Sequence, residues 1–181
     1  MNGTAPLLAM GEPSPWITRY AGLLPSAGQV LDLAAGSGRH TRFFSKLGRS
    51  ILAIDRDVSG LVDLQATAGI EVMARDLEIG HGWPLPGRQF AAIVVTNYLH
   101  RPLLPFLGGA LQPGGVLLYE TFAAGNEPFG KPSNPAFLLQ PGELLRVAQT
   151  AGLTVVAYEH GEVTTPRPAV IQHIAAKKPE A

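Results

Sequence analysis

Cysteine is absent from the sequence of 181 residues, and charged side chains are sparse. The absence of cysteine excludes disulfide bonds, thiolate-bound zinc and a cysteine nucleophile. Charged residues make up 15% of the chain, and 14 basic and 14 acidic side chains give a formal net charge of zero. No overall field therefore draws the protein toward a nucleic-acid backbone or an anionic membrane.

The sequence also has no run of about 18 apolar residues, the length that a membrane span requires, and its start has no basic and apolar leader. We therefore expect a protein of the cytoplasm. Apolar residues make up 46% of the chain, which is enough for the core of one domain. We expect a lead-in with one helix over residues 1–25 and a single domain over residues 26–181.

From residue 29 onward, short apolar runs alternate with amphipathic stretches, a pattern typical of βαβ units. Continuous apolar runs predict strands that are buried on both faces of a parallel sheet. We predict an α/β fold with a doubly wound, mostly parallel sheet of seven strands. Its last two strands form an antiparallel pair at the edge. The expected strands are residues 30–34, 50–55, 70–76, 90–97, 114–122, 153–161 and 168–178. The expected helices are Trp16–Leu24, Arg39–Leu47, Val58–Ala68, Pro102–Leu111 and Gly142–Thr150.

A glycine-rich turn, AGSG at residues 35–38, follows the first expected strand and precedes a helix. Gly36 and Gly38 allow a nucleotide to approach the backbone closely there. Dinucleotide-binding folds use a third glycine, where this chain has Thr41. The strand also carries an acid, Asp32, which favours the cationic S-adenosylmethionine over the pyrophosphate of NAD.

Two further acids end the second and third expected strands. Asp55 can accept hydrogen bonds from a ribose diol. Asp76 can accept from an adenine amino group, beside which Leu77 offers an apolar contact. Each acid can also be a local helix cap, which is the alternative reading.

Five segments in order, DLAAGSG, AIDRD, RDLE, NYLHR and LQPGGVLLYETF, resemble the successive motifs of class I S-adenosylmethionine-dependent methyltransferases. The resemblance covers residues 29 to the C-terminus by element order, and the small tellurite-resistance-type enzymes are the most similar branch. It implies S-adenosyl-L-methionine as cofactor and a Rossmann-like methyltransferase fold. Ala34 departs from the glycine that is more frequent at its position, and we expect it to tolerate an extended backbone.

The resemblance also implies a set of cofactor contacts. Asp32, Gly36 and Gly38 would bound the methionine end of the cofactor, Asp55 the ribose, and Asp76 with Leu77 the adenine. Asn97 would lie nearest the transferred methyl group. The full set expected to bind the cofactor is Asp32, Ala34, Gly36, Gly38, Arg39, Asp55, Arg56, Asp76, Leu77 and Asn97. Arg39 has an alternative role as a solvated residue of the first helical turn.

Methyl transfer needs alignment and exclusion of water, and it needs a base only for some acceptors. The candidates for a catalytic base are His100, Tyr98 and Glu120, with Tyr119 beside them; each also has a structural reading. Trp16 and Tyr20 either cover the cofactor or pack in the core. The loop 123–141 carries Phe129 and Phe137. It is either a lid or a wall of the acceptor pocket, or else a static surface connector.

Other functions stay open at this level. An NAD(P)-dependent oxidoreductase and a non-catalytic nucleotide-binding domain are the alternatives to a methyltransferase. Among acceptors, neutral charge favours a small molecule over RNA or protein. His40, His81, His160 and His173 lack metal-ligand spacing, so we expect no metal. The acceptor and the oligomeric state do not follow from the sequence.

Overall fold

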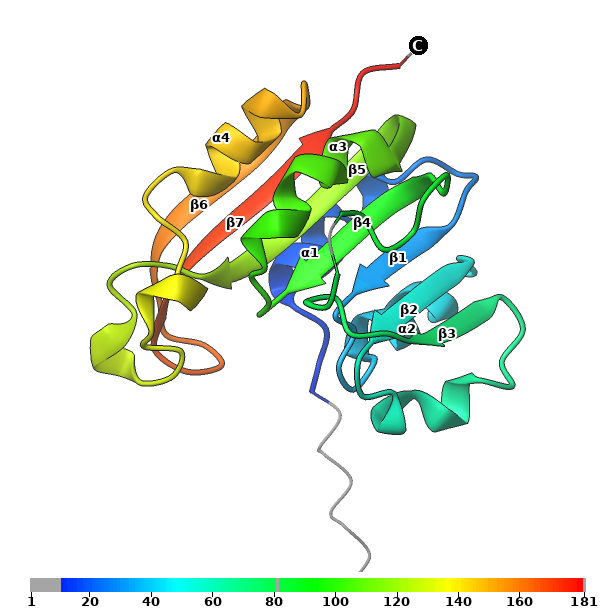
Figure 1. The fold of residues 1–181 in the computed structure, drawn as a ribbon, viewed down its shortest axis with the longest axis horizontal. Coiled ribbons are helices and arrows are strands. Elements are labelled where there is room, and N and C mark those ends of the chain that lie inside the picture. Colours follow the sequence, from blue (N-terminus) through cyan, green and yellow to red (C-terminus); the bar gives the residue numbers. More distant parts are fainter. Residues whose placement is uncertain (1–10, 81, 181) are drawn as a thin grey trace, which may run out of the picture.

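In the computed structural model, which describes residues 11–80 and 82–180, one mixed sheet of seven strands forms the centre of the molecule (Figure 1). The predicted sheet is therefore confirmed. The strands are β1 Val30–Leu33, β2 Ile51–Asp55, β3 Ile70–Ala74, β4 Phe90–Thr96, β5 Leu111–Phe122, β6 Thr154–Val163 and β7 Ala169–Lys177. The α-helices are α1 Pro15–Tyr20, α2 Arg39–Lys46, α3 Leu107–Ala110 and α4 Glu143–Thr150. The 3-10 turns are η1 Ala21–Leu23, η2 Ser59–Leu64, η3 Arg101–Phe106, η4 Glu127–Phe129 and η5 Pro135–Phe137.

The strand order is β3-β2-β1-β4-β5-β7-β6. The first five strands of this order are parallel, and β7 runs antiparallel to both β5 and β6. The chain reverses its direction of travel across the sheet between β1 and β4. Open α/β sheets bind ligands beside such a reversal, outside the carboxyl ends of the strands.

Two apolar layers cover the sheet, one on each face. The first contains the inward side chains of η3, α3 and α4, and the second contains those of α1, α2 and η2. Figure 1 shows α3 and α4 in front of the sheet, with α1 and α2 behind it. Strands β1, β2 and β4 are buried along almost their whole length, which explains their continuous apolar runs.

Two of the predicted helices are shorter and more tightly wound than expected. The stretch Val58–Ala68 forms the six-residue 3-10 turn η2, in which a side chain at Gly60 would come within 3.0 Å of the Ser37 backbone. The stretch Pro102–Leu111 begins as the 3-10 turn η3 and contains a single α-helical turn, α3. Pro105 has no amide hydrogen to donate, which prevents an uninterrupted α-helix there.

The described part of the lead-in, residues 11–25, packs on the sheet with the rest of the chain. Ser14 caps α1, with its hydroxyl accepting from the Trp16 amide at 3.1 Å. Trp16 is 5% exposed, and its indole nitrogen donates to the carbonyl of Ile174 in β7 at 3.2 Å. Ile17 is fully buried. Within residues 11–80 and 82–180, no helix has the length and apolar character of a membrane span.

Candidate functional site

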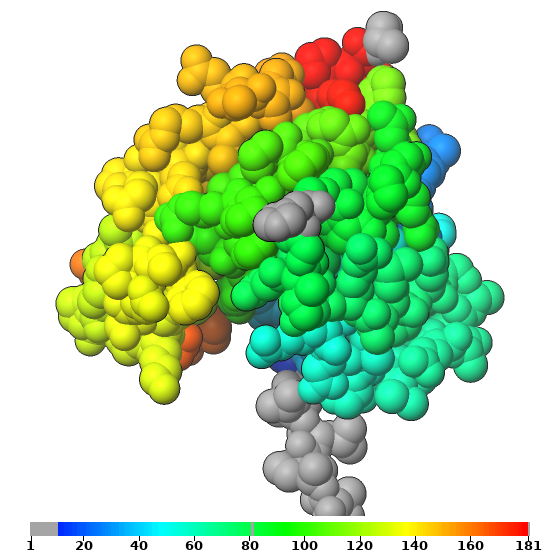
Figure 2. Space-filling view, in the orientation of Figure 1, coloured from blue at the N-terminus to red at the C-terminus, as the bar shows by residue number. Residues whose placement is uncertain are grey.

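A cleft of about 280 Å³ opens at the carboxyl ends of β1 to β4. In Figure 2 the surface is hollowed between the yellow loop around residue 137 and the cyan and green region that carries β2 and β3. Two carboxylates and one guanidinium group that the sequence had singled out line the cleft. The lining residues are Ala34, Asp55, Arg56, Asp76, Leu77, Glu78, Thr96, Asn97 and Tyr98.

Asp55 connects the end of β2 to the glycine-rich loop after β1. Its Oδ2 accepts from the Gly36 amide at 2.8 Å, and its Oδ1 accepts from the Asp57 amide at 3.0 Å. Each carboxylate oxygen retains a further lone pair for a ligand hydroxyl. Asp55 therefore shapes the loop and also faces the cleft.

The backbone of the loop turns through left-handed conformations at three positions. Ala34 has a φ of 59°, so its backbone is not extended as expected, and this left-handed angle explains why glycine is favoured there. Gly36, with a φ of 55°, has open space where a side chain would be. At Gly38, with a φ of 77°, a side chain would collide with the side chains of Leu61 and Arg42. Gly36 therefore has free space beside it, whereas Gly38 lies against η2 and is favoured there by its left-handed backbone.

Asp76 and Leu77 follow the end of β3 on the opposite wall. The Asp76 carboxylate accepts from the Glu78 amide at 2.9 Å, a local turn that fixes its position. Leu77 is 9% exposed and presents an apolar surface to the cleft. The structure thus brings Asp55, Asp76 and Leu77 together as predicted, with Arg56 between the acids in the lining.

Asp32 differs from the expectation. Its side chain is 2% exposed and lies behind the glycine-rich loop, outside the set of residues that line the cleft. Its Oδ2 accepts from the Thr41 hydroxyl at 2.6 Å, and burial raises the pKa of Asp32 to about 6. Thr41, which replaces the third glycine of dinucleotide-binding loops, is therefore the partner of this acid. Asp32 braces β1 against α2 instead of facing the cleft.

Arg39 and Glu120 belong to a polar cluster beneath the lead-in, which we define as Ser14, Arg39, His40, Thr96, Glu120 and His173. Glu120 is 8% exposed; it accepts from the Ser14 hydroxyl at 2.6 Å and lies 3.9 Å from the Arg39 guanidinium. Burial raises the pKa of Glu120, and the two contacts oppose this rise. Neither Arg39 nor Glu120 lines the cleft, so the structure does not bring either to the positions expected from the sequence.

Contacts within the same cluster fix the side chains of His40 and Trp16. The Ser14 amide donates to His40 Nε2 at 3.1 Å, which requires a neutral imidazole, and burial lowers the pKa of His40 to about 3. Trp16 stacks on His173 with ring centroids 4.9 Å apart, and Tyr20 packs on Trp16 at 4.6 Å. Trp16 therefore packs in the core, the second of the two roles considered for it.

Tyr98 lies in the wall of the cleft directly after β4. Its backbone carbonyl accepts from the Tyr119 hydroxyl at 2.8 Å, which makes Tyr119 a support for this wall. The Tyr98 hydroxyl is buried and has no hydrogen-bond partner among the described residues. Burial, together with the carboxylates of Glu78 and Asp76, raises the pKa of Tyr98 well above that of a free phenol. A neutral phenol can donate a hydrogen bond to a ligand, but it is a poor candidate for a base.

A second cavity, of about 250 Å³, adjoins the cleft and shares three of its wall residues, Glu78, Asn97 and Tyr98. Its other walls come from the segment after β4, the end of β5 and the loop 123–141. They are mostly apolar: Leu99, Thr121, Phe122, Pro132 and Phe137. Part of the loop 123–141 therefore forms a wall of a cavity, as the lid hypothesis requires.

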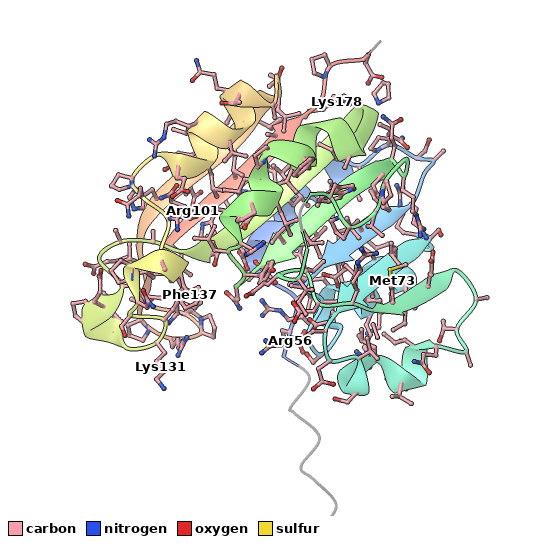
Figure 3. The ribbon with its side chains drawn as sticks, in the orientation of Figure 1. Arg56, Met73, Arg101, Lys131, Phe137 and Lys178 are labelled. Carbon is pink, nitrogen blue, oxygen red and sulfur yellow. The ribbon has the colours of Figure 1, made fainter. Side chains whose placement is uncertain are left out.

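Arg101 fixes this part of the loop. Its guanidinium group donates to the carbonyls of Ala136 and Leu138 at 2.7 and 2.8 Å. It also pairs with both carboxylate oxygens of Glu143 at 2.7 and 2.9 Å. These contacts hold the backbone on both sides of Phe137, which nevertheless remains 50% exposed. Figure 3 shows Arg101 next to the loop, with Phe137 and Arg56 on opposite sides of the gap between the two halves of the surface.

His100, the remaining candidate for a base, precedes η3 and is half-buried. It does not line either cavity, so its role as a base stays a prediction. Glu78 was missed at the sequence level because it lies beyond the strand end that drew attention to Asp76. Four histidines were considered as metal ligands in the sequence, and one of them, His81, lies outside the described residues. Within the described part of the chain, no group of three His, Asp or Glu side chains is arranged to hold a metal ion.

Comparison with known proteins identifies the fold. No family model matches the chain, and no curated protein matches it in sequence. Among solved structures, TehB from Haemophilus influenzae is similar over 90% of this chain and 61% of its own, with a TM-score of 0.69 and 17% identity. A SAM-dependent methyltransferase from Methanosarcina mazei is similar over 94% of this chain and 100% of its own, with a TM-score of 0.68 and 15% identity.

A third structure holds ligands. The 1,6-didemethyltoxoflavin-N1-methyltransferase of Burkholderia thailandensis, with bound 1,6-didemethyltoxoflavin and S-adenosylhomocysteine, is similar over 97% of this chain and 80% of its own. Its TM-score is 0.67 and its identity is 20%. The chain spans about 61% of the length of the Haemophilus influenzae protein. The chain therefore has the fold of S-adenosylmethionine-dependent methyltransferases, as its motifs predicted.

Proposed function

We propose that the chain is an S-adenosylmethionine-dependent methyltransferase that acts on a small molecule. The observation that carries the proposal is the pair of carboxylates, Asp55 and Asp76, that face one cleft at the point where the strand order reverses. Structures with this fold have been solved with S-adenosylmethionine or S-adenosylhomocysteine bound. The cleft of this chain is acidic and offers an apolar contact at Leu77, which suits a cationic nucleoside.

Each part of the cofactor has residues in or beside the cleft that suit it. Asp55 would accept from the ribose hydroxyls, while Asp76 and Leu77 would hold the adenine and the Gly36 loop the methionine end. Asn97 and the unpartnered Tyr98 hydroxyl lie where the first cavity meets the second, next to the place expected for the methyl group. When bound, the cofactor supplies an electrophilic methyl group on a positively charged sulfur. The protein's part is to align the acceptor with it and to exclude water.

The geometry weighs against an NAD(P)-dependent oxidoreductase. Three carboxylates and one guanidinium group line the first cavity, at Asp55, Asp76, Glu78 and Arg56. A pyrophosphate would meet net negative charge there. Thr41 stands at the position of the third glycine, and its hydroxyl donates a hydrogen bond to the Asp32 carboxylate. A fluorescence titration that compares NADH with S-adenosylmethionine separates the two functions.

The second cavity favours an enzyme over a protein that merely binds the nucleotide. It shares a wall with the first, so a molecule in it would contact the region of the transferred methyl group. Its volume of about 250 Å³ suits a small molecule, and the net charge of zero offers no general attraction for RNA.

The experiment that tests the proposal is calorimetric titration of S-adenosylmethionine into the wild-type protein and the Asp55→Ala variant. We expect the substitution to weaken binding by about 100-fold, because two charge-assisted hydrogen bonds to the ribose are lost. Asp57→Ala is the matched control, since Asp57 is two residues away and does not line the cleft. Equal affinities of the wild type and Asp55→Ala, in folded protein, would contradict the ribose role. Absence of binding to the wild type would refute the function itself.

A further inference from the structure

The second cavity indicates the chemical class of the acceptor, an inference that rests on the proposed function. We propose that the acceptor is a small planar aromatic molecule without an anionic group, methylated on an amino or ring nitrogen, and that Glu78 selects it. The proposal comes from three properties of the cavity: its aromatic and apolar walls, its charge and the presence of Glu78 in the lining of both cavities.

The walls suit a ring. Three aromatic side chains and a proline face the cavity, from the end of β4, the end of β5 and the loop 123–141: Tyr98, Phe122, Phe137 and Pro132. Aromatic pairs favour offset or edge-to-face contacts, which add to the free energy of burying the ring surface. A cavity of about 250 Å³ accommodates one substituted ring or a small fused pair, since about 150 Å³ suffices for benzene.

Phe137 is the strongest sign that a ligand completes this wall. It is 50% exposed, yet Arg101 binds the carbonyls of both its chain neighbours and thereby fixes the backbone. An aromatic side chain on a fixed backbone at the mouth of a cavity offers contact area without the entropic cost of ordering the loop. Phe122, on the opposite wall, is 9% exposed and is held from outside by the Arg167 guanidinium, 5.4 Å from its ring centroid.

The charge of the walls selects against anions. Glu78 faces both cavities, and Asp55 and Asp76 lie in the adjoining one, opposed by Arg56. An acceptor that carries a carboxylate or a phosphate would be repelled by this set. An N–H group is favoured instead, because the Glu78 carboxylate and the side chains of Asn97 and Thr121 can accept its hydrogen bond.

The transfer balances without any further reactant. The nitrogen lone pair forms the new N–C bond while the C–S bond of the cofactor breaks, and its electron pair remains on sulfur. For an amine, the proton of the resulting cation passes to the Glu78 carboxylate and from there to solvent. An aromatic amine holds a free lone pair at neutral pH, so no strong base is needed before the transfer.

Three probes of similar size test the proposal with radiolabelled S-adenosylmethionine: 4-methylaniline, 4-aminobenzoate and 4-methylcyclohexylamine. We expect N-methylation of 4-methylaniline, with kcat/KM at least tenfold above that of either of the others. The reason is that 4-aminobenzoate adds an anion, whereas 4-methylcyclohexylamine lacks the planar ring and, being protonated at neutral pH, also lacks the free lone pair. Glu78→Gln is expected to reduce the discrimination against 4-aminobenzoate at least fivefold. A preference for 4-aminobenzoate, or binding of S-adenosylmethionine without binding or methylation of 4-methylaniline, would overturn the inference while leaving the proposed function standing.

The loop provides a matched control. Phe137→Ala is expected to raise KM for 4-methylaniline at least tenfold with unchanged affinity for S-adenosylmethionine. Phe129 lies on the same loop and is 38% exposed, but it lines neither cavity, so Phe129→Ala is expected to behave as the wild type. Equal KM values for the two variants would overturn the role of the aromatic wall.

Discussion

At the scale of single residues, the position of each acid relative to its strand decides its role. Asp55 and Asp76 come after the last buried residue of their strands and face the cleft, whereas Asp32 lies within β1 between Leu31 and Leu33. Side chains alternate between the faces of a strand, so Asp32 shares the face of Val30 and points toward α2. An acid at that position is buried, and its pKa is raised.

This burial makes the stability of the protein depend on pH. Because the pKa of Asp32 rises from 3.8 in the unfolded chain to about 6 in the folded one, the folded state binds more protons between these values. The contribution of Asp32 to the free energy of unfolding is therefore full below pH 4 and falls by about 3 kcal/mol as the pH rises through 6. We expect Asp32→Asn to gain stability relative to the wild type over this range, measured by urea unfolding at pH 4, 5, 6 and 7.

Comparison of the two proteins at each pH isolates Asp32 from its neighbours. His40 has the opposite effect, since its pKa is lowered to about 3 and its contribution is lost as the pH falls from 6.5 toward 3. That effect is common to the wild type and to Asp32→Asn, so it cancels in the difference. A stability difference that stays constant from pH 4 to 7 would show that Asp32 is not protonated in the folded state.

The residues of the first cavity were more predictable than those of the second. Asp55, Asp76, Leu77 and Asn97 follow apolar runs that are recognisable strands, and parallel strands bring their ends to one edge. The wall of the second cavity depends on the path of a loop. The position of the Glu120 side chain depends on a hydrogen bond from Ser14, which is 106 positions away in the sequence. Contacts of that kind have no local signal in the sequence.

At the scale of elements, Arg101 fixes the part of the loop 123–141 that surrounds Phe137. Arg101 alone supplies hydrogen bonds to two carbonyls of the loop and a two-point ion pair with Glu143 at the start of α4. A planar guanidinium group can make all these contacts at once, which a lysine cannot do. The segment around Phe137 is therefore held as a wall, next to Leu138 and Leu139, which are fully buried.

Arg101→Gln is expected to free the segment around Phe137. Without the guanidinium group, the amides of Phe137 and Leu138, which close turns at 2.9 and 3.2 Å, should exchange with deuterium at least tenfold faster. Arg146→Gln is the matched control, because Arg146 donates to the carbonyl of Pro141 at the far end of the loop. Identical exchange in Arg101→Gln and the wild type would refute the role of Arg101.

At the scale of the whole molecule, the lead-in completes the second apolar layer. Trp16 and Ile17 belong to the same buried cluster as β1, β2 and β4. The polar cluster beneath the lead-in adds hydrogen bonds from Ser14 to α2 and β5. The described residues on the two sides of position 25 therefore share one core.

Trp16→Ala is expected to lower the free energy of unfolding by about 3–5 kcal/mol, because a large buried side chain is removed. The second tryptophan, Trp83, packs on the opposite face of the sheet and reports on the rest of the core. Its fluorescence transition in urea should shift together with the circular dichroism of the backbone. A Trp83 transition at the wild-type midpoint would show that the lead-in unfolds independently, and Trp16→Phe should give a smaller shift than Trp16→Ala.

The hydrogen bond between the Gly36 amide and the Asp55 carboxylate joins two groups of the protein itself. A nucleoside that enters the cleft thus meets a loop that has already lost its conformational freedom, and the entropic cost of ordering that loop belongs to folding instead of association. The hydrogen bond that fixes the loop after β1 to the end of β2 thus contributes to the affinity of the binding site.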